Sequence, residues 1–355
     1  MMKRLNKQTK SNIITYGIVI IAFLVIQIVS MTGGLSSLLK GLLVPLCVYV
    51  ILALSLNLTV GILGELSLGH AGFMCAGAFS SAFFSKCMED VITVGPVRFI
   101  LALIIGAAVA ALFGLLIGIP VLRLKGDYLA IVTLAFGEII KNLVNVLYIG
   151  RDSQGFHFST KDAVSLNMEA DGEVIIKGAQ GITGTPKDSS FLIGVILILI
   201  TLFIILNLVN SRDGRAIMAI RDNRIAAESI GINITKYKLM AFTISAAMAG
   251  VAGALYAHNL STLTALPKNF GYNMSIMILV FVVLGGIGNM RGSIIAAVIL
   301  TLLPELLRGL SDYRMLIYAV VLIAMMLFKW APKAIEWRER FGEKLKIKKT
   351  AKEVK

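Results

Sequence analysis

The segment GELSLGHAGFMCAGAF, residues 64–79, places four glycines, an acid, a serine and a histidine in a strongly apolar sequence. Polar, glycine-rich backbone at membrane depth is tolerated only where it is buried in protein or lines a cavity. Glycines there permit close helix approach and non-helical backbone dihedrals. Two interpretations are open: the glycines only pack helices while His70 hydrogen-bonds at the membrane edge, or the segment lines or shapes a path through the membrane.

The composition of the whole chain indicates a membrane protein. Of its 355 residues, 57% are hydrophobic and 15% are charged, whereas soluble domains carry about 25% charged residues. The apolar residues form runs of about 20, the length that spans a bilayer, without the two-residue alternation of a β-barrel strand. We therefore predict an all-α polytopic fold of about ten transmembrane helices. The candidate spans are residues 13–32, 38–58, 71–85, 98–118, 128–147, 191–210, 239–258, 271–288, 292–307 and 314–329.

The positive charge is concentrated in three polar segments rather than spread over the chain. Residues 1–12 carry four Lys or Arg and no acid, residues 211–238 carry six against three acids, and residues 329–355 carry ten against four. These segments supply +13 of the net charge of +14. Basic residues gather on the cytoplasmic side of membrane proteins, so the charge predicts topology and does not indicate a nucleic-acid partner.

An even number of spans and this charge map place both termini in the cytoplasm. The predicted organisation is a basic cytoplasmic N-terminus at 1–12, one membrane domain at 13–330 and a basic cytoplasmic tail at 331–355. The domain contains an outside loop at 148–190, which holds four Lys or Arg and six Asp or Glu, and a cytoplasmic loop at 211–238.

The outside loop contains VSLNMEADGEVIIKG, residues 164–178, in which Asp171-Gly172 separates two stretches of alternating polarity. An Asp-Gly pair between such stretches is typical of a β-hairpin. A hairpin that rests on an external partner and a disordered polar loop are both open.

Six residues of the opening segment and the preceding span are candidates for a translocation path, because ionisable and polar groups inside a membrane are expensive and usually functional. Ser67 and His70 with Glu65 nearby also suggest an intramembrane hydrolase, but no second acid orients His70 and no oxyanion hole is evident. We therefore predict no catalytic residue. The three cysteines have no metal-binding spacing, so no metal site is predicted either. The path candidates are Asn57, Glu65, Ser67, Gly69, His70 and Gly72.

The longest polar segment on the predicted inner side is SRDGRAIMAIRDNRIAAESIGINITKYK, residues 211–238. Its isoleucines at 217, 220, 225 and 230 have partial helical periodicity, and Gly231 is a plausible helix stop. A short amphipathic helix that seats in a groove of a cytoplasmic partner and a solvated or headgroup-bound basic loop are both open.

Two further segments hold polar residues between spans. Glu138 and Lys141 are three residues apart and are expected to pair; facing a central cavity is the alternative. VLGGIGNMRGS, residues 283–293, is a glycine-rich turn with no preceding strand and no following Gly-Lys-Ser/Thr. Because no Walker motif is present, any ATP used with this protein must bind to another chain.

Four segments together resemble the permease subunits of branched-chain amino acid ABC importers, specifically the longer LivM type. The resemblance covers roughly residues 40 to 330. The segments are LSLNLTVGILGELSLGHAGF (54–73), RLKGDYLAIVTLAFGEIIK (123–141), GRAIMAIRDNRIAAESIGINITKYKLMAFTISAAMAGVAGALYAH (214–258) and VFVVLGGIGNMRGSIIAA (280–297).

This resemblance implies a heteromeric importer in a bacterial inner membrane, with the architecture of the ten-helix class of ABC importer permeases. A second permease subunit shares the path, two cytoplasmic ATPase subunits use ATP and Mg, and an extracytoplasmic binding protein delivers the solute. This chain carries no cofactor of its own. The residues implied in contact with the ATPase are Gly214, Arg215, Arg221, Arg224, Ala227, Glu228 and Gly231.

One segment departs from the family pattern. In relatives, a glycine-rich outside segment precedes a Gly-Ile-Pro sequence. The corresponding segment of this chain is GAQGITGTP, residues 178–186. Contacts with the binding protein are expected at Gly181, Thr183 and Gly184. The implied solutes are leucine, isoleucine and valine, with urea or another small polar solute as the alternative within the family. An independent secondary carrier would instead need carboxylates deep in its spans, and Glu65, Glu138 and Glu305 are the candidates.

Overall fold

A computed structural model describes residues 7–32, 36–122, 128–169, 172–307 and 313–330. Contacts divide the chain into two compact units, residues 1–297 and 298–355. The boundary falls inside helix α12, so the first unit holds α1 to α11 with the start of α12, and the second holds the rest of α12 with α13. The single membrane domain predicted over residues 13–330 stays a prediction, and the tail at 331–355 lies outside the described residues.

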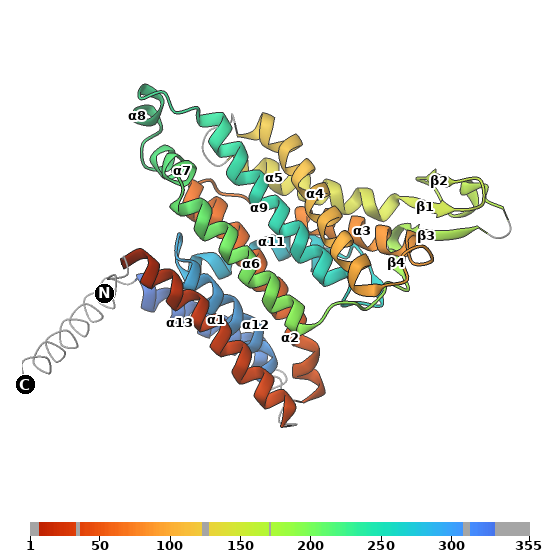
Figure 1. The fold of residues 1–355 in the computed structure, drawn as a ribbon, viewed down its shortest axis with the longest axis horizontal. Coiled ribbons are helices and arrows are strands. Elements are labelled where there is room, and N and C mark those ends of the chain that lie inside the picture. Colours follow the sequence, from red (N-terminus) through yellow and green to blue (C-terminus); the bar gives the residue numbers. More distant parts are fainter. Residues whose placement is uncertain (1–6, 33–35, 123–127, 170–171, 308–312, 331–355) are drawn as a thin grey trace, which may run out of the picture. The chain divides into compact units, whose positions relative to one another are not determined.

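Each predicted span coincides with a helix of the structure (Figure 1). Five helices begin at a Ser or Asn whose side chain accepts a hydrogen bond from the first-turn backbone, which fixes their start. The helices are α1 (Lys7–Met31), α2 (Ser37–Asn57), α3 (His70–Cys87), α4 (Gly95–Val121), α5 (Tyr128–Val146), α6 (Phe191–Asn210), α7 (Arg212–Asp222), α8 (Arg224–Ser229), α9 (Ile234–Ala257), α10 (Pro267–Phe270), α11 (Tyr272–Gly285), α12 (Met290–Leu306) and α13 (Arg314–Trp330).

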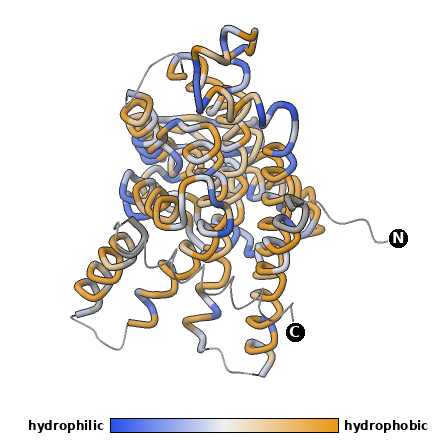
Figure 2. Tube along the Cα trace, turned by 90° about the vertical axis from the view of Figure 1, so that its left-hand side faces the viewer, coloured by the Kyte–Doolittle hydropathy of each residue, from blue (hydrophilic) through white to orange (hydrophobic). Residues whose placement is uncertain are grey.

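Seven stretches of the described residues are long and apolar enough to cross a membrane. Most of the helical tube in Figure 2 has the hydrophobic colour, and its blue stretches are short. The chain is thus a helical, multi-pass membrane protein, while a count of ten spans stays a prediction because α3, α12 and α13 do not meet the same criterion. The seven stretches are Asn12–Met31, Ser37–Leu63, Gly95–Val121, Tyr128–Val146, Phe191–Asn210, Ile234–Ala257 and Pro267–Gly285.

The all-α expectation is wrong in one respect, because the first unit also holds a five-stranded antiparallel sheet in the order β2-β1-β3-β4-β5. The last strand comes from the segment after α9, so the sheet joins two loops that are far apart in the sequence. The strands are β1 (Tyr148–Arg151), β2 (Phe156–Ser159), β3 (Glu173–Lys177), β4 (Ile182–Thr183) and β5 (Thr262–Leu263), with short 3-10 turns at Val164–Leu166 and Gly178–Gln180.

The β-hairpin that was one of two alternatives for residues 164–178 is not formed by the described residues. Residues 164–166 form a 3-10 turn, and β3 pairs with β1 and β4 instead. Local alternation found the strand but not its partners, because those partners lie outside the hairpin window. Asp171, the first residue of the expected turn, lies outside the described residues.

The centre of the first unit is built where α3, α4 and α9 cross, with α2 packed against α9. Glycines face one another where α3 crosses α9 and where α3 crosses α5. A Cβ on Gly77 would clash with the backbone of Gly250, and a Cβ on Gly72 would clash with the Cα of Gly137. Small residues let membrane helices approach closely enough for dispersion contacts to hold them together.

Candidate functional site

Helix α2 continues directly as a π-helix, η1 (Leu58–Leu63). This π-helix stops at Gly64, the first residue of the glycine-rich segment, which has a left-handed φ of 80°. Residues 65–69 have no helical structure, and α3 then starts at His70. π-Helical turns are rare and occur often at functional sites. The glycine-rich segment therefore begins with a break between two helices, in which Ser67 and Gly69 are buried while Gly64 and Leu66 are exposed.

Asn57 lies at the junction of α2 and the π-helix, and its side chain is fully buried. Its Nδ2 donates to Ser293 Oγ at 2.9 Å, and its Oδ1 accepts from the backbone amide of Gly288 at 2.8 Å. Both partners belong to the late glycine-rich turn or the start of α12. Gly61 also packs directly on this turn, because an added Cβ would clash with Gly288. The two glycine-rich segments of the sequence are therefore in contact.

His70 is buried and hydrogen-bonded rather than exposed in an open path. Its Nε2 lies 2.7 Å from Ser55 Oγ, and the backbone carbonyl of Ser55 accepts from Ser245 Oγ at 2.5 Å. The next amide, that of Ala71, donates to Ser275 Oγ at 3.1 Å. The first turn of α3 is thus hydrogen-bonded to α2 and to α11, and α2 is in turn hydrogen-bonded to α9.

The pairing needed for an intramembrane hydrolase is not formed. Among the described residues, the buried Ser67 Oγ has no hydrogen-bond partner, and His70 Nε2 is used by Ser55. A serine nucleophile needs its base within hydrogen-bond distance. Gly69 and Gly72 serve packing, since a Cβ at either position would clash with the backbone of α5.

Glu65 makes an ion pair with Lys238 near the start of α9. Only 6% of the Lys238 side chain and 18% of the Glu65 side chain are exposed. A buried charge needs a partner, because isolated burial costs several kcal/mol per ion. Glu138 and Lys141 also pair, as expected, and the second oxygen of Glu138 accepts from the backbone amide of Tyr272 at 2.7 Å.

Arg221 connects the predicted coupling loop to the π-helix. Its Nη1 donates to the carbonyl oxygen of Gly61 at 2.9 Å, and the same guanidinium pairs with Asp222 at 2.8 Å. Its aliphatic stem packs on Gly64, where an added Cβ would lie 2.5 Å from Arg221 Cγ. The loop therefore contacts the break between α2 and α3 directly.

The other six residues implied in ATPase contact differ in exposure. Arg215, Arg224 and Glu228 are exposed, whereas Gly214 and Ala227 are buried. Ala227 belongs to a small cluster with Ile220 and Ile234. The sixth residue, Gly231, ends α8 with a φ of 84°.

The isoleucines of this loop also differ in burial. Ile217 and Ile220 face inward, whereas Ile225 and Ile230 are 81% and 74% exposed. The exposed side of α8 is thus charged at Arg224 and Glu228 and apolar at Ile225 and Ile230. In Figure 1, α7 and α8 lie at the opposite end of α9 from the sheet.

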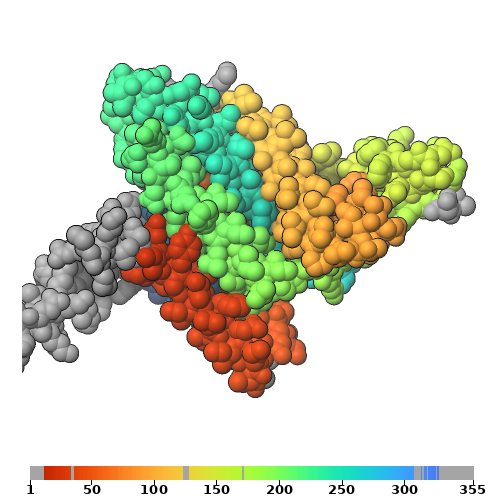
Figure 3. Space-filling view, in the orientation of Figure 1, coloured from red at the N-terminus to blue at the C-terminus, as the bar shows by residue number. Residues whose placement is uncertain are grey.

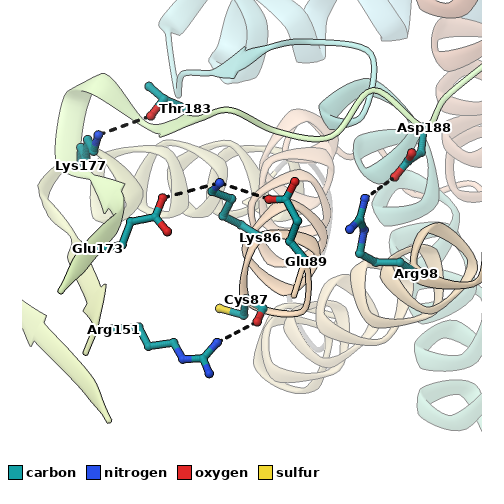
Figure 4. Close-up of polar contacts among 9 residues, drawn as sticks. All are labelled: Lys86, Cys87, Glu89, Arg98, Arg151, Glu173, Lys177, Thr183 and Asp188. Carbon is teal, nitrogen blue, oxygen red and sulfur yellow. Dashed lines mark hydrogen bonds and ion pairs between the residues drawn. The ribbon is translucent and has the colours of Figure 1, made fainter. Parts of the chain in front are cut away.

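At the sheet end, ion pairs join the loops to α3 and α4 (Figure 4). Lys86 lies 3.2 Å from Glu89 and 3.6 Å from Glu173 of β3, and Arg98 lies 3.3 Å from Asp188. Arg151 of β1 donates to the carbonyl of Cys87 at 2.9 Å. The sheet is thereby fastened to the last turn of α3.

The three residues expected to contact a binding protein lie along this sheet. Thr183 and Gly184 are exposed, and Lys177 Nζ donates to Thr183 Oγ1 at 3.4 Å. Gly181 is buried, has a φ of 70° and would clash with the carbonyl of Leu263 if it carried a Cβ. Gly181 therefore shapes the strand, while the other two are accessible.

Sequence reasoning missed the partners that complete these contacts. Ser55, Ser245, Ser275 and Ser293 each supply a hydroxyl to the network around Asn57 and the start of α3. Their signal was a single serine within an apolar span. Such a serine also satisfies itself by bonding to its own helix, so the sequence alone does not distinguish the two uses.

Comparison with known proteins places the chain in a family. The family model described as "Branched-chain amino acid transport system / permease component" matches residues 38–328. The LivM proteins of Salmonella typhimurium and Escherichia coli, named as high-affinity branched-chain amino acid transport system permease proteins, are 36% identical over 297 residues, which is 81% of this chain and 67% of theirs.

More distant relatives include a nucleoside transport permease and another permease of branched-chain amino acid transport. The nucleoside ABC transporter permease NupC of Lactococcus lactis is 24% identical over 76% of this chain and 86% of its own. The LivH permease of Salmonella typhimurium is 23% identical over 79% of this chain and 88% of its own. No solved structure matches. With a family model that covers most of its length and relatives at 36% identity, this chain belongs to the permease component family of branched-chain amino acid transport systems.

Proposed function

We propose that this chain is a LivM-type permease subunit of an ATP-driven importer of leucine, isoleucine and valine. The observation that carries the proposal is the 36% identity to two LivM proteins over 81% of the chain. The chain forms half of the translocation path and works by alternating access. A second permease of the LivH kind, to which the chain is also similar, forms the other half.

The proposed energy source lies on other chains. Two cytoplasmic ATPase subunits bind and hydrolyse ATP with Mg, and an extracytoplasmic binding protein delivers the amino acid. The exposed side of α8, with its two isoleucines and two charged residues, is suited to a groove on an ATPase subunit. Both termini and α7–α8 then lie in the cytoplasm, and the sheet faces the binding protein through Thr183 and Gly184.

The proposed motion passes from α7 to the π-helix through Arg221. ATP-driven closure of the ATPase subunits shifts α7 and α8, and the Arg221 hydrogen bond carries that shift to Gly61. Asn57, Glu65 and His70 then shape the path by holding the break between α2 and α3, rather than by facing the solute. Any solute-driven step must come from different affinities for the outward and inward states.

A secondary carrier is a weaker alternative. It needs free carboxylates for ion coupling, but two of the three candidates, Glu65 and Glu138, pair with lysines. The large basic loop at 211–238 also has no purpose in such a carrier.

Uptake by the whole complex in liposomes, with ATP inside and binding protein outside, tests the proposal. Radiolabelled leucine should accumulate, and unlabelled isoleucine and valine should compete with it. Urea and a nucleoside serve as matched competitors. Competition by urea or nucleoside alone would assign a different solute, and ATP-independent uptake would assign a secondary carrier.

A further inference from the structure

A groove about 650 Å³ in volume lies between α4 and α6, with α9 beneath it. Its walls are six residues of α4 from Pro96 to Ala107 and four residues of α6 from Ile193 to Ile200. Val251 forms the floor, and Asp188 is at one end. In Figure 3, α9 (teal) is visible between α6 (green) and α4 (yellow-orange). Nothing in the proposed transport function uses this groove.

The position of the groove places it in one leaflet of the bilayer. Both walls belong to helices that are long and apolar enough to span a membrane. The α4 wall covers twelve positions, about 16 Å at 1.5 Å per residue, which matches half of a hydrocarbon core of about 30 Å. Both walls are the N-terminal halves of their helices, so the groove occupies the leaflet beside the sheet.

The length and lining of the groove favour an acyl chain as its occupant. A hydrocarbon chain that lies along the groove makes carbon–carbon contacts at about 3.5–4.0 Å with both walls. The lining is apolar except for Asp188, which suits an acyl chain over a polar solute.

Asp188 is the charged residue that lines the end of the groove, and one basic residue lies next to it in space and another in sequence. Asp188 holds Arg98 through one carboxylate oxygen, and Lys187 beside it is exposed. Arg98 is 7% exposed, and within the described part of the chain its Nε has no hydrogen-bond partner. An acid with one oxygen free of that ion pair suits a lipid ammonium group, and the neighbouring lysine suits the lipid phosphate.

We propose that this groove binds one phospholipid of the leaflet beside the sheet, with an acyl chain between α4 and α6 and an amine-bearing headgroup at Asp188. The bound chain fills the space that the two helices leave over α9. The site is independent of which solute the complex transports, so failure of one proposal leaves the other standing.

Photo-crosslinking tests this site in the intact complex, purified in a mild detergent. Two lipid probes are used: phosphatidylethanolamine with a diazirine in its acyl chain, and phosphatidylglycerol with the same chain. Peptides from residues 96–107 and 193–200 should carry the label, and phosphatidylethanolamine should label them severalfold more strongly.

A matched pair of variants on α4 provides the specificity control. Ile104 lines the groove and is 59% exposed, while Leu116 is 57% exposed and lies outside it. Ile104→Trp should lower the labelling at least fivefold, and Leu116→Trp should leave it unchanged, with both complexes intact by size exclusion.

Four outcomes would overturn the proposal or its headgroup assignment. Label spread evenly along α4, or equal labelling of the two variants, would show that the groove is ordinary lipid-facing surface. Crosslinks from a diazirine amino acid placed at Ile104 to the second permease would show that protein occupies it. Equal labelling by the two lipids would overturn the headgroup assignment.

Discussion

Glu65 and Lys238 are 173 positions apart, and their ion pair fastens the loop after the π-helix to the start of α9. Two other polar residues near the break between α2 and α3 also have partners on distant or neighbouring elements. Asn57 satisfies its amide on a turn that is 231 positions away, and His70 meets Ser55 on the preceding helix. Individual polar side chains thus hold a backbone break that apolar packing alone would not specify.

Removing one partner of the Glu65–Lys238 pair should be worse than removing both. Glu65→Gln leaves the Lys238 charge buried, and breaking a buried pair costs about 3–5 kcal/mol. The double variant Glu65→Gln with Lys238→Gln should recover most of that loss. Thermal unfolding of the purified complex measures both.

The exposed pair between Lys86 and Glu173 is the control for this prediction. The Glu173 side chain is 66% exposed, and exposed pairs contribute about 0–1 kcal/mol, so Glu173→Gln should shift the unfolding temperature little. If the Glu65→Gln, Lys238→Gln double variant lost as much stability as its two single variants together, the pairing of Glu65 with Lys238 would be contradicted.

Among the elements, the helices were largely predictable and their long-range partners were not. The apolar run predicted at residues 191–210 is helix α6 to the residue, and the run at 128–147 is α5 within one residue. Capping residues and apolar length determine such bounds locally. Strands β4 and β5 have two residues each, and they form only because Ile182 and Leu263 meet across the fold, so no local pattern could predict them.

The π-helix was equally hidden, because its sequence LTVGIL reads as ordinary apolar helix. Its contact with Arg221 could not be predicted either, since residues 160 positions apart make that hydrogen bond. The sequence did place Arg221 in a coupling loop, but as a contact for an ATPase subunit. The geometry adds the inward contact.

Loss of the Arg221 hydrogen bond should uncouple transport. Hydrogen bonds from charged groups contribute about 1.5–3 kcal/mol, so Arg221→Gln should lower leucine uptake about tenfold or more at unchanged ATP hydrolysis. Arg212→Gln, on the same helix, exposed and outside the residues implied in ATPase contact, should change the ratio little. Equal ratios of uptake to hydrolysis in the two variants would rule out this transmission.

The crossing of α3 and α9 depends on the absence of a side chain at Gly77. A Cβ there would clash with Gly250 backbone, whereas Gly41 has open space around it. Gly77→Ala should lower the unfolding temperature of the complex by several degrees. Gly41→Ala should leave it the same or raise it slightly, because Ala is favoured over Gly in a helix by about 0.5–1 kcal/mol. A Gly77 variant as stable as the wild type would contradict the close crossing.

Acid should loosen the turn between β1 and β2. Burial alone raises the pKa of Asp152, but hydrogen bonds from three backbone amides and from His157 outweigh it, so the pKa lies below 3.8. A lowered carboxyl pKa adds stability above the unfolded value, and that stability is lost as pH falls through the folded pKa. Hydrogen exchange of this turn should therefore stay slow above pH 4 and accelerate below it, after correction for intrinsic rates.

Asp152→Asn is the matched variant for the acid prediction. It should exchange faster than wild type at neutral pH and lose the added acceleration below pH 4. An identical pH profile in wild type and variant would exclude Asp152 as the responsible group.

For the molecule as a whole, the sequence predicts which segments face the cytoplasm and which other subunits the chain contacts. The basic segments at 1–12, 211–238 and 329–355 predict one cytoplasmic face. Within the first unit, α7–α8 and the sheet lie at opposite ends of α9, as an ATPase contact on one side and a binding-protein contact on the other require. This chain supplies the paired polar residues and the break between α2 and α3. ATP hydrolysis is proposed to take place on other subunits.

Co-purification tests this assignment most directly. The tagged chain is extracted from its native membrane in a detergent shown to preserve a known ABC importer, and the proteins retained with it are identified by mass spectrometry. We predict recovery of a second permease and an ATPase subunit in stoichiometric amounts. Recovery of the chain alone under those conditions would contradict the account and favour an independent carrier.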